Sequence, residues 1–435
     1  MNRDELKQAV CAEIDRRRDD IIGIAHTMRG HPELGYKEFK TAALVRDTLA
    51  GLGLPVREGL AITGVDAVLA GGQPGPAICI MGELDSVTGR DAEVCDPVTG
   101  AAHQCGHHIQ VATMLGAAIG LAGSGVAPSL AGRVHFLGAP AEEFLEIEYR
   151  LGLADEGKVT YLSGKQELIK LGYFDDIAMA MMVHSAAKSP EPGFYFSGQA
   201  NGFLAKFVRY VGRASHAGAS PHEGVNALNA ACLGILAVHA QRETFRDQDA
   251  IRVHPIITKG GDVVNVVPAD VRIETFVRGR TVEAILDASK KVDRAFRGGG
   301  DAVGAETIIQ NVPGYLPIYQ DENLTRLAEA NGRALLGERG VLEAPFLGGS
   351  LDVGDLSHLM PVLHPFVGGA QGALHAADFK VLDYEASAVA PAKLMAMTAI
   401  DLLADGAAAA QEISASFRPM LTKAQYLEMM EGLRR

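Results

Sequence analysis

The chain has 435 residues, of which 48% are hydrophobic and 21% charged, as is typical of globular proteins with a large buried core. Its length suggests two or three domains. The formal net charge is −13 and Lys and Arg form no block, which argues against nucleic acid as the main partner, because phosphate binding needs clustered positive charge. A few local arginines would still suffice for an anionic small substrate.

The first 20 residues are charged and lack the apolar segment of a secretory signal. Uncharged apolar stretches of 18 residues or more are absent from the sequence, so we expect no membrane partner. The five cysteines are scattered and odd in number, which is typical of free thiols in a reducing compartment. We therefore expect a cytoplasmic protein in which one cysteine is available for chemistry.

The first 200 residues alternate between helical and strand patterns. Residues 4–28 and 39–53 have apolar positions at helical spacing, and a third helix is expected from Gln110 to about Leu121. Short apolar runs predict buried strands, and several of them end in polar residues; they lie at residues 66–72, 77–84, 132–143 and 177–185. This order predicts an α/β sheet flanked by helices, with a site at the strand ends.

From about Ala200 the pattern changes to a strand, a helix, two strands, a helix and a strand. This βαββαβ order is that of a small α+β, ferredoxin-like domain that is complete in itself. A helical pattern resumes at residues 322–337. We therefore predict a catalytic domain formed by residues 1–199 and 314–435, interrupted by an inserted domain at residues 200–313.

The segment HQCGHHIQ, residues 103–110, places Cys105 and His107 two positions apart, just before a helix. Gly106 between them permits an unusual backbone that would let both side chains face one point. Thiolate and imidazole groups are good zinc ligands, and manganese is the harder alternative. Two other interpretations remain open at this point: a polar helix start with a buried cysteine, or a Cys105 nucleophile with a histidine base.

Further polar side chains follow other predicted strands. Glu142 and Glu143 follow one strand, so one can bind a metal while the other manages the protons of a water, as metal-assisted hydrolysis requires. His184 ends the next strand, and His375 lies late in the chain. Asp85 could accept a hydrogen bond from a ligand imidazole and so fix its tautomer.

With these residues in hand, the chain resembles the zinc aminoacylase and carboxypeptidase superfamily, and within it the amidohydrolase branch of hippurate, auxin-conjugate and aminobenzoyl-glutamate hydrolases. The resemblance covers nearly the whole chain. It is carried by six segments in order: HPELGYKEFKTAALV, CGHH, PAEE, GRASHAGASPHEGVNALNA, GGDVVNVVPADVRIETFVR, and the C-terminal pair GGSLDVGDLSHLMP and LHAADF. The resemblance implies that the inserted domain is a lid or dimerisation domain and that the chain forms a homodimer or higher homo-oligomer.

The resemblance also implies the roles of individual residues. Glu142 would be the general base, Asp85 would orient a ligand histidine, and His216 would stabilise the developing oxyanion. Asn265 and Arg278 would hold the substrate, and Arg278 suits a carboxylate. One or two divalent transition-metal ions, zinc or manganese, would be bound by five ligands: Cys105, His107, Glu143, His184 and His375.

The chain departs from the branch at several positions. His108 and Gln110 stand where relatives carry Asp and His, and Glu83 stands where they carry Asp or His. After PAEE, the bulky segment FLEIEYRLGLADEGK replaces a glycine-rich run, which makes Tyr149 and Arg150, together with His108, candidate substrate contacts. These differences put in doubt both the second metal position and the usual amide substrate.

The implied reaction is the attack of metal-activated water on an electrophilic carbon with loss of nitrogen from a small, carboxylate-bearing substrate. The overall likeness and the unusual segment after PAEE place an aromatic amine slightly ahead, specifically the conversion of 5-nitroanthranilate to 5-nitrosalicylate and ammonia, in which the para nitro group would accept charge during addition. The alternative is amide hydrolysis of N-acyl amino acids or aminobenzoyl-glutamate. A non-catalytic binding protein on the same fold is a third possibility.

Overall fold

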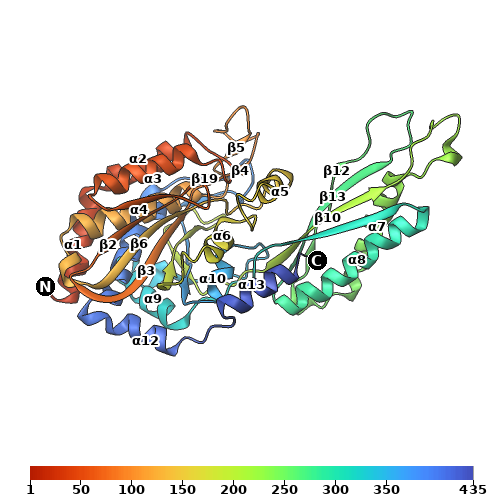
Figure 1. Cartoon of the computed structure of the whole chain (residues 1–435). Helices are drawn as coiled ribbons and strands as arrows, with labels where there is room; N and C mark the ends of the chain where they lie inside the picture. The colour runs from red at the N-terminus through yellow and green to blue at the C-terminus, as the bar shows by residue number, and fades with distance from the viewer. Residues whose placement is uncertain (435) are drawn as a thin grey trace. The chain divides into compact units, whose positions relative to one another are not determined.

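Figure 1 shows the computed structural model, which describes residues 1–434. Contacts within the chain divide it into two compact units. The first comprises Met1–Gln199, Tyr319–Phe346 and Leu356–Met420, and the second comprises Ala200–Ile318, Leu347–Asp355 and Leu421–Arg435. The second unit begins at the residue where the sequence predicts the inserted domain, and it includes two later segments that the sequence assigns to the catalytic domain.

The first unit is built on a six-stranded mixed sheet. Its strands, in order across the sheet, are β1 (Val56–Leu60), β2 (Gly64–Ala70), β6 (Ala131–Ala139), β3 (Gln73–Glu83), β7 (Ile177–Met181) and β16 (Val362–Leu363). β1, β2 and β6 pair antiparallel, whereas β6, β3, β7 and β16 pair parallel. The carboxyl ends of four neighbouring strands therefore lie along one edge of the sheet, which is where ligand sites of α/β proteins form.

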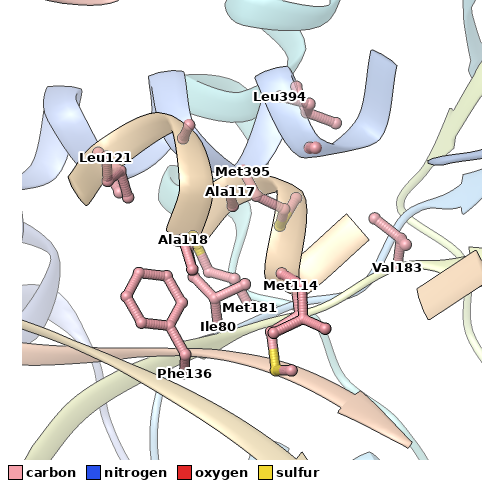
Figure 2. Close-up of a cluster of buried hydrophobic side chains, with 14 of the residues drawn as sticks. Ile80, Met114, Ala117, Ala118, Leu121, Phe136, Met181, Val183, Leu394 and Met395 are labelled. Atoms are coloured by element: carbon pink, nitrogen blue, oxygen red, sulfur yellow. The ribbon is translucent and has the colours of Figure 1, made fainter. Parts of the chain in front are cut away.

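Helix α4 (His107–Gly123) is the central helix of this unit and is buried almost along its whole length. It packs on β3 and is covered by α1 (Arg3–Arg16), α2 (Arg18–Arg29) and α11 (Ala390–Leu403). Figure 2 shows the apolar side chains between α4 and the sheet, including Met114, Phe136 and Met181. The helix begins three residues earlier than the sequence suggests, because its first turn carries polar side chains that a periodicity of apolar residues does not detect.

The remaining elements of the first unit surround this core. The helices are α3 (Phe39–Gly51), α5 (Ile147–Asp155), α6 (Gly164–Lys170), α9 (Glu322–Leu336) and α12 (Ala408–Ser416). A smaller sheet contains β15 (Val341–Glu343), β9 (Phe194–Phe196), β17 (Phe366–Val367) and β8 (His184–Ser185), in that order. Two short pairs are β4 (Val87–Thr88) with β5 (Ala101–Ala102), and β18 (Ala370–Gln371) with β19 (Lys380–Val381).

One helix, Glu385–Leu403, is long and apolar enough to cross a membrane by length and composition alone. Of its most apolar window, 89% is buried inside the protein, where it packs on α4 and α9. Its apolar surface is thus accounted for by the core of the first unit.

The second unit is an antiparallel sheet with two helices. In chain order its main elements are β10 (Gly202–Val211), α7 (Ala227–Ala240), β11 (Arg252–Val253), β12 (Ile256–Lys259), β13 (Asp270–Gly279), α8 (Val282–Val303) and β14 (Glu306–Pro313). β10 lies between β13 and β14, and β11 and β12 pair with the other side of β13. This is the predicted βαββαβ arrangement. The α/β domain with an inserted α+β domain is therefore confirmed.

Helix α13 (Lys423–Gly432) also belongs to the second unit. The hydroxyl of Tyr426 on this helix donates a hydrogen bond to Asp355 over 2.8 Å. Both residues are fully buried. This contact joins the two late segments to each other, and the backbone N–H of Leu316, which donates to Asp355 Oδ2 over 3.4 Å, links them to residues 200–318.

Candidate metal centre

Two strands of the parallel part of the sheet, one helix and one loop position the candidate ligands. Glu142 and Glu143 follow β6, and His184 forms β8 just after β7, while Cys105 and His107 stand at the start of α4. His375 comes from the loop before β19. The structure therefore brings together, within the first unit, all five side chains that the sequence proposes as ligands.

Gly106 allows Cys105 and His107 to face the same point. Its φ of +87° lies in the left-handed region, and a Cβ there would lie 2.6 Å from Cβ of Ser185. A side chain at this position would therefore be strained and would push against the strand that carries His184. Two non-glycine residues of the centre also have positive φ, Ala141 at +52° and His375 at +60°. Such local strain is typical of functional sites.

The ligand atoms are within a few ångströms of one another. Cys105 Sγ lies 3.1 Å from His375 Nε2 and 3.5 Å from His184 Nε2. His375 Nε2 lies 3.1 Å from Glu143 Oε1, and His107 Nε2 lies 3.8 Å from the same oxygen. In the described part of the chain, three groups of side chains have the spacing of metal ligands: Cys105, His107 and His184; Cys105, Glu143 and His375; and Glu83, His107 and Glu142.

These residues fit a divalent metal ion. Among residues 1–434, buried side-chain atoms without a hydrogen-bond partner include Glu83 Oε2, His107 Nε2 and Glu143 Oε1. Leaving such atoms without a partner is costly unless another group, such as an ion, binds them. The thiolate and imidazole donors suit zinc, and the carboxylates also accept manganese.

Asp85 holds both His107 and the backbone of Glu143 in place. Nδ1 of His107 donates to the backbone oxygen of Asp85 over 3.0 Å and to its Oδ1 at 3.2 Å, so Nε2 is the nitrogen left for a metal. The other carboxylate oxygen of Asp85 accepts the backbone N–H of Glu143 over 2.9 Å. One fully buried carboxylate thus fixes the tautomer of His107 and the position of the Glu142–Glu143 loop.

Electrostatics within the centre favour positive charge. Burial alone would lower the pKa of His107, but the carboxylates of Glu83 and Asp85 raise it to about 9. Burial and the carboxylates of Glu143 and Glu142 raise the pKa of the Cys105 thiol. A metal ion would displace both protons, because only the thiolate and the neutral imidazole are ligands.

Glu142 is the proposed general base. It is buried, and its Oε2 lies 3.8 Å from His107 Nε2. The backbone that carries it is held by Glu38, whose Oε1 accepts the N–H of Ala141 over 2.7 Å. The base is therefore fixed beside the cluster while its neighbour, Glu143, points to His375.

Two further buried residues, Lys165 and His364, carry no signal in the sequence. Lys165 is completely buried and donates a hydrogen bond to Glu83 Oε1 over 2.6 Å. Both ring nitrogens of His364 are buried and lack a hydrogen-bond partner within residues 1–434. Burial and nearby His184 lower the pKa of His364 to about 3, so its ring is neutral. The segment around Lys165, SGKQE, has no recognisable motif. Glu83, by contrast, is visible in the sequence as the polar residue at the end of the β3 strand pattern.

Arg150 does not face an open pocket, contrary to the expectation of a substrate contact. Its buried guanidinium donates to the backbone oxygens of Leu162 over 2.7 Å, Glu143 over 2.5 Å and Ala141 over 3.4 Å. This makes it a support for the loop of the general base. Tyr149 is 37% exposed, and the ammonium of Lys37 lies 4.0 Å from its ring centre.

His108 is placed outside the three ligand groups in the described part of the chain. It lies with His103, whose ring centre is 5.2 Å away, and with Tyr384 at 6.0 Å. Burial and the nearby guanidinium of Arg29 lower the pKa of His108 to about 3. The neutral ring thus forms part of the buried environment of α4, and its role as a substrate contact stays a prediction.

The other three candidates belong to the second unit. His216 Nδ1 accepts the backbone N–H groups of Gly218 and Ala219, which leaves Nε2–H as the donor of the neutral ring. The backbone oxygen of Asn265 accepts from Ala217, so this residue lies next to the His216 segment. The roles of both residues toward the metal centre stay predictions.

Arg278 on β13 belongs to the same unit. Its guanidinium donates to Ser350 Oγ over 2.7 Å and lies 5.2 Å from the ring centres of both Phe203 and Phe276. A guanidinium held by aromatic rings is well ordered, which suits recognition of a planar anion. Its role in binding a substrate carboxylate is likewise still a prediction.

Comparisons with known proteins agree with this architecture. Residues 201–298 match the family model of the peptidase dimerisation domain. The Xaa-Arg dipeptidase of Mus musculus is 30% identical over 320 residues, covering 71% of this chain and 68% of the relative. The N-acyl-L-amino acid amidohydrolase of Geobacillus stearothermophilus is 25% identical over 351 residues, 78% of this chain and 87% of the relative.

Among solved structures, a dinuclear metal-binding peptidase of the M20 family from Bacillus subtilis matches 89% of this chain and 99% of its own, with a TM-score of 0.64 and 21% identity. That likeness supports the fold. The sequence relatives, the dimerisation-domain match and the assembled ligand cluster together show that the chain belongs to the M20 family of metal-dependent hydrolases.

Proposed function

We propose that this protein hydrolyses an amide C–N bond in a small substrate that carries a carboxylate, such as an N-acyl amino acid or aminobenzoyl-glutamate. The observation that carries the proposal is the buried carboxylate of Glu142 beside a Cys, His and Glu ligand cluster. The relatives reported above, a dipeptidase and an N-acyl amino acid amidohydrolase, favour an amide over the aromatic amine that sequence analysis places first.

The chain supplies the proton transfers of this reaction. A bound divalent ion would act as a Lewis acid and lower the pKa of a water molecule toward about 7. Glu142 takes a proton from the attacking water and later delivers it to the leaving nitrogen, so that the amide and water become a carboxylic acid and an amine. The burial of Glu142 limits competing solvent, and the Asp85 contact with the Glu143 backbone keeps the base in place.

Substrate recognition is proposed to involve the second unit. Arg278 would pair with the substrate carboxylate, Asn265 would add a hydrogen bond, and His216 would donate to the developing oxyanion. The match to a peptidase dimerisation domain over residues 201–298 also supports a homodimer.

The purified protein, loaded with zinc or with manganese, should be assayed against N-acetyl amino acids, hippurate, aminobenzoyl-glutamate and 5-nitroanthranilate. Release of amine from an amide, with a Glu142→Gln variant that keeps its metal and loses activity, is the expected result. If 5-nitroanthranilate is the only compound turned over, with release of ammonia, the substrate is an aromatic amine and not an amide. Metal-loaded protein that turns over none of these compounds would contradict the proposal and favour a binding protein.

A further inference from the structure

Glu83 reaches into the metal centre from the end of β3, although the set of five ligands does not include it. Its side chain is 1% exposed. Oε1 accepts a hydrogen bond from the ammonium of Lys165 over 2.6 Å. Within residues 1–434, its Oε2 makes no hydrogen bond, and neither does Nε2 of His107; the two atoms lie 3.3 Å apart and form an ion pair when His107 is protonated.

This separation is the one that two ligands of a single ion would have. Oxygen and nitrogen ligands bind zinc at about 2.0–2.2 Å, and a tetrahedral angle then places the two ligand atoms about 3.4 Å apart. Nδ1 of His107 is engaged by Asp85, so its free nitrogen and Oε2 of Glu83 are left facing the same space. The carboxylate of Glu142, the proposed general base, lies beside the pair, with one atom of each of the three side chains within 4.8 Å of the others.

We propose that Glu83 is an additional metal ligand through Oε2, and that Lys165 is the positioning residue that holds its other oxygen. Because the ammonium occupies Oε1, the carboxylate presents a single oxygen in a fixed orientation. Lys165 itself comes from the first turn of α6 and is fully buried, so its position is set by the fold. The inference concerns metal binding alone and is independent of which C–N bond is cleaved.

The additional oxygen gives the centre two chemically different sides. Cys105 and His184 offer sulfur and nitrogen, which select zinc-like ions. Glu83 and His107 offer oxygen and nitrogen, which also suit harder ions such as manganese. We therefore expect the Glu83 side to be the one that takes Mn²⁺ most readily.

The test uses metal-free full-length protein titrated with Mn²⁺ and Zn²⁺, with metal content measured by mass spectrometry and Mn²⁺ binding followed by paramagnetic resonance. Glu83→Gln keeps an oxygen for Lys165 but presents an amide nitrogen, which is not a ligand, toward His107. We expect Mn²⁺ to bind at least about tenfold more weakly to this variant. In protein loaded with Co²⁺, the charge-transfer band between the Cys105 thiolate and the ion should persist in this variant, since Cys105 and His184 are unchanged.

Lys165→Met tests the positioning role separately. Release of Oε1 should let Glu83 bind with both oxygens, which changes the visible spectrum of the Co²⁺ form. Lys206→Met is the matched control, because Lys206 is also a buried lysine that lies 2.6 Å from a carboxylate, Asp293, in the second unit. An unchanged Co²⁺ spectrum in Lys165→Met would refute the positioning role.

A last variant guards against misfolding caused by an unpaired buried charge. Glu83→Met combined with Lys165→Met removes both charges, and replacing a whole buried ion pair by apolar residues is usually tolerated. The double variant should fold, keep its thiolate band and bind Mn²⁺ as weakly as Glu83→Gln. Mn²⁺ affinity and stoichiometry at the wild-type level in either Glu83 variant would overturn the assignment of Glu83 as a ligand.

Discussion

Replacing Arg150 by methionine should both destabilise the protein and impair catalysis. The guanidinium makes two short hydrogen bonds, to the backbone oxygens of Leu162 and Glu143, and a weaker one to Ala141. Each bond from a charged donor contributes about 1.5–3 kcal/mol, and an abandoned buried carbonyl has a comparable cost. Counting only the two short bonds, we expect the free energy of unfolding to fall by about 3–6 kcal/mol.

The catalytic effect follows from the same contacts. Glu143 and Ala141 flank the general base, so a shift of their backbone moves Glu142 relative to the ligand cluster. A displacement of about 1 Å can cost about 100-fold in rate, and we expect kcat to fall by about 10–100-fold with KM little changed. Lysine keeps the charge but lacks the several planar N–H donors of the guanidinium. Arg150→Lys should therefore lower the free energy of unfolding by nearly as much as Arg150→Met.

Denaturant unfolding of the metal-free protein and steady-state kinetics of the loaded protein measure these effects. Arg418→Met is the matched control, since Arg418 also donates to two backbone oxygens, of Ala415 and Phe417, but does so at the exposed surface. Its effect should stay within about 0.5 kcal/mol. An Arg150→Met variant with the stability and kcat of the wild type would refute the reasoning, because the loop would then not depend on the guanidinium.

Further predictions concern the base, a ligand, a buried carboxyl and the second unit. Glu142→Gln should lower kcat by about 10²–10⁴-fold while metal content measured by mass spectrometry is unchanged. Cys105→Ala should reduce bound zinc per chain in the same measurement, and undiminished zinc would contradict its role as a ligand. Burial and the Asp85 carboxylate raise the pKa of Glu38 from 4.5 to about 7, so the folded chain keeps a proton that the unfolded chain releases. The free energy of unfolding of the metal-free protein should therefore fall by up to about 3 kcal/mol between pH 4.5 and 7, and denaturant titrations of Glu38→Gln should lack this fall. Leu236 on α7 is 64% exposed, and we expect the proposed homodimer to use this face: Leu236→Glu should then elute as a monomer in size-exclusion chromatography, and elution unchanged from the wild type would contradict this.

The fold and part of the candidate site could be predicted because their signals are local, whereas His375 and the full set of five candidate ligands came only from the family resemblance. Strand patterns that end in a polar residue indicate a shared sheet edge, as with Glu143 and His184, and Gly106 marks the turn between Cys105 and His107. The order of elements in the inserted domain likewise follows from periodicity alone. Each of these inferences needs only a few consecutive residues.

The supporting residues could not be predicted, because their contacts depend on the path of the whole chain. Arg150 interacts with backbone oxygens, which leave no signature in the sequence, and it lies in a segment whose charged residues suggested a surface or a substrate contact. Lys165 stands in a short helix with an ordinary polar pattern, and only the tertiary fold brings it within 2.6 Å of Glu83. The assignment of Leu347–Asp355 and Leu421–Arg435 to the second unit likewise depends on tertiary contacts, such as that of Tyr426 with Asp355, which the sequence does not reveal.

Several departures from the amidohydrolase pattern, among them Glu83 and His108, lie at or beside the candidate metal ligands. Glu83 is buried at the end of β3, and the buried ammonium of Lys165 supplies the compensating positive charge, so we expect each residue to depend on the other in the interior. A buried charge that loses its partner typically costs about 3–5 kcal/mol, whereas removal of both partners is close to neutral. The two residues should therefore behave as one unit in a double-mutant cycle: each single apolar substitution should destabilise the metal-free protein more than the double substitution does. Additive effects would instead mean that the 2.6 Å contact contributes little to stability.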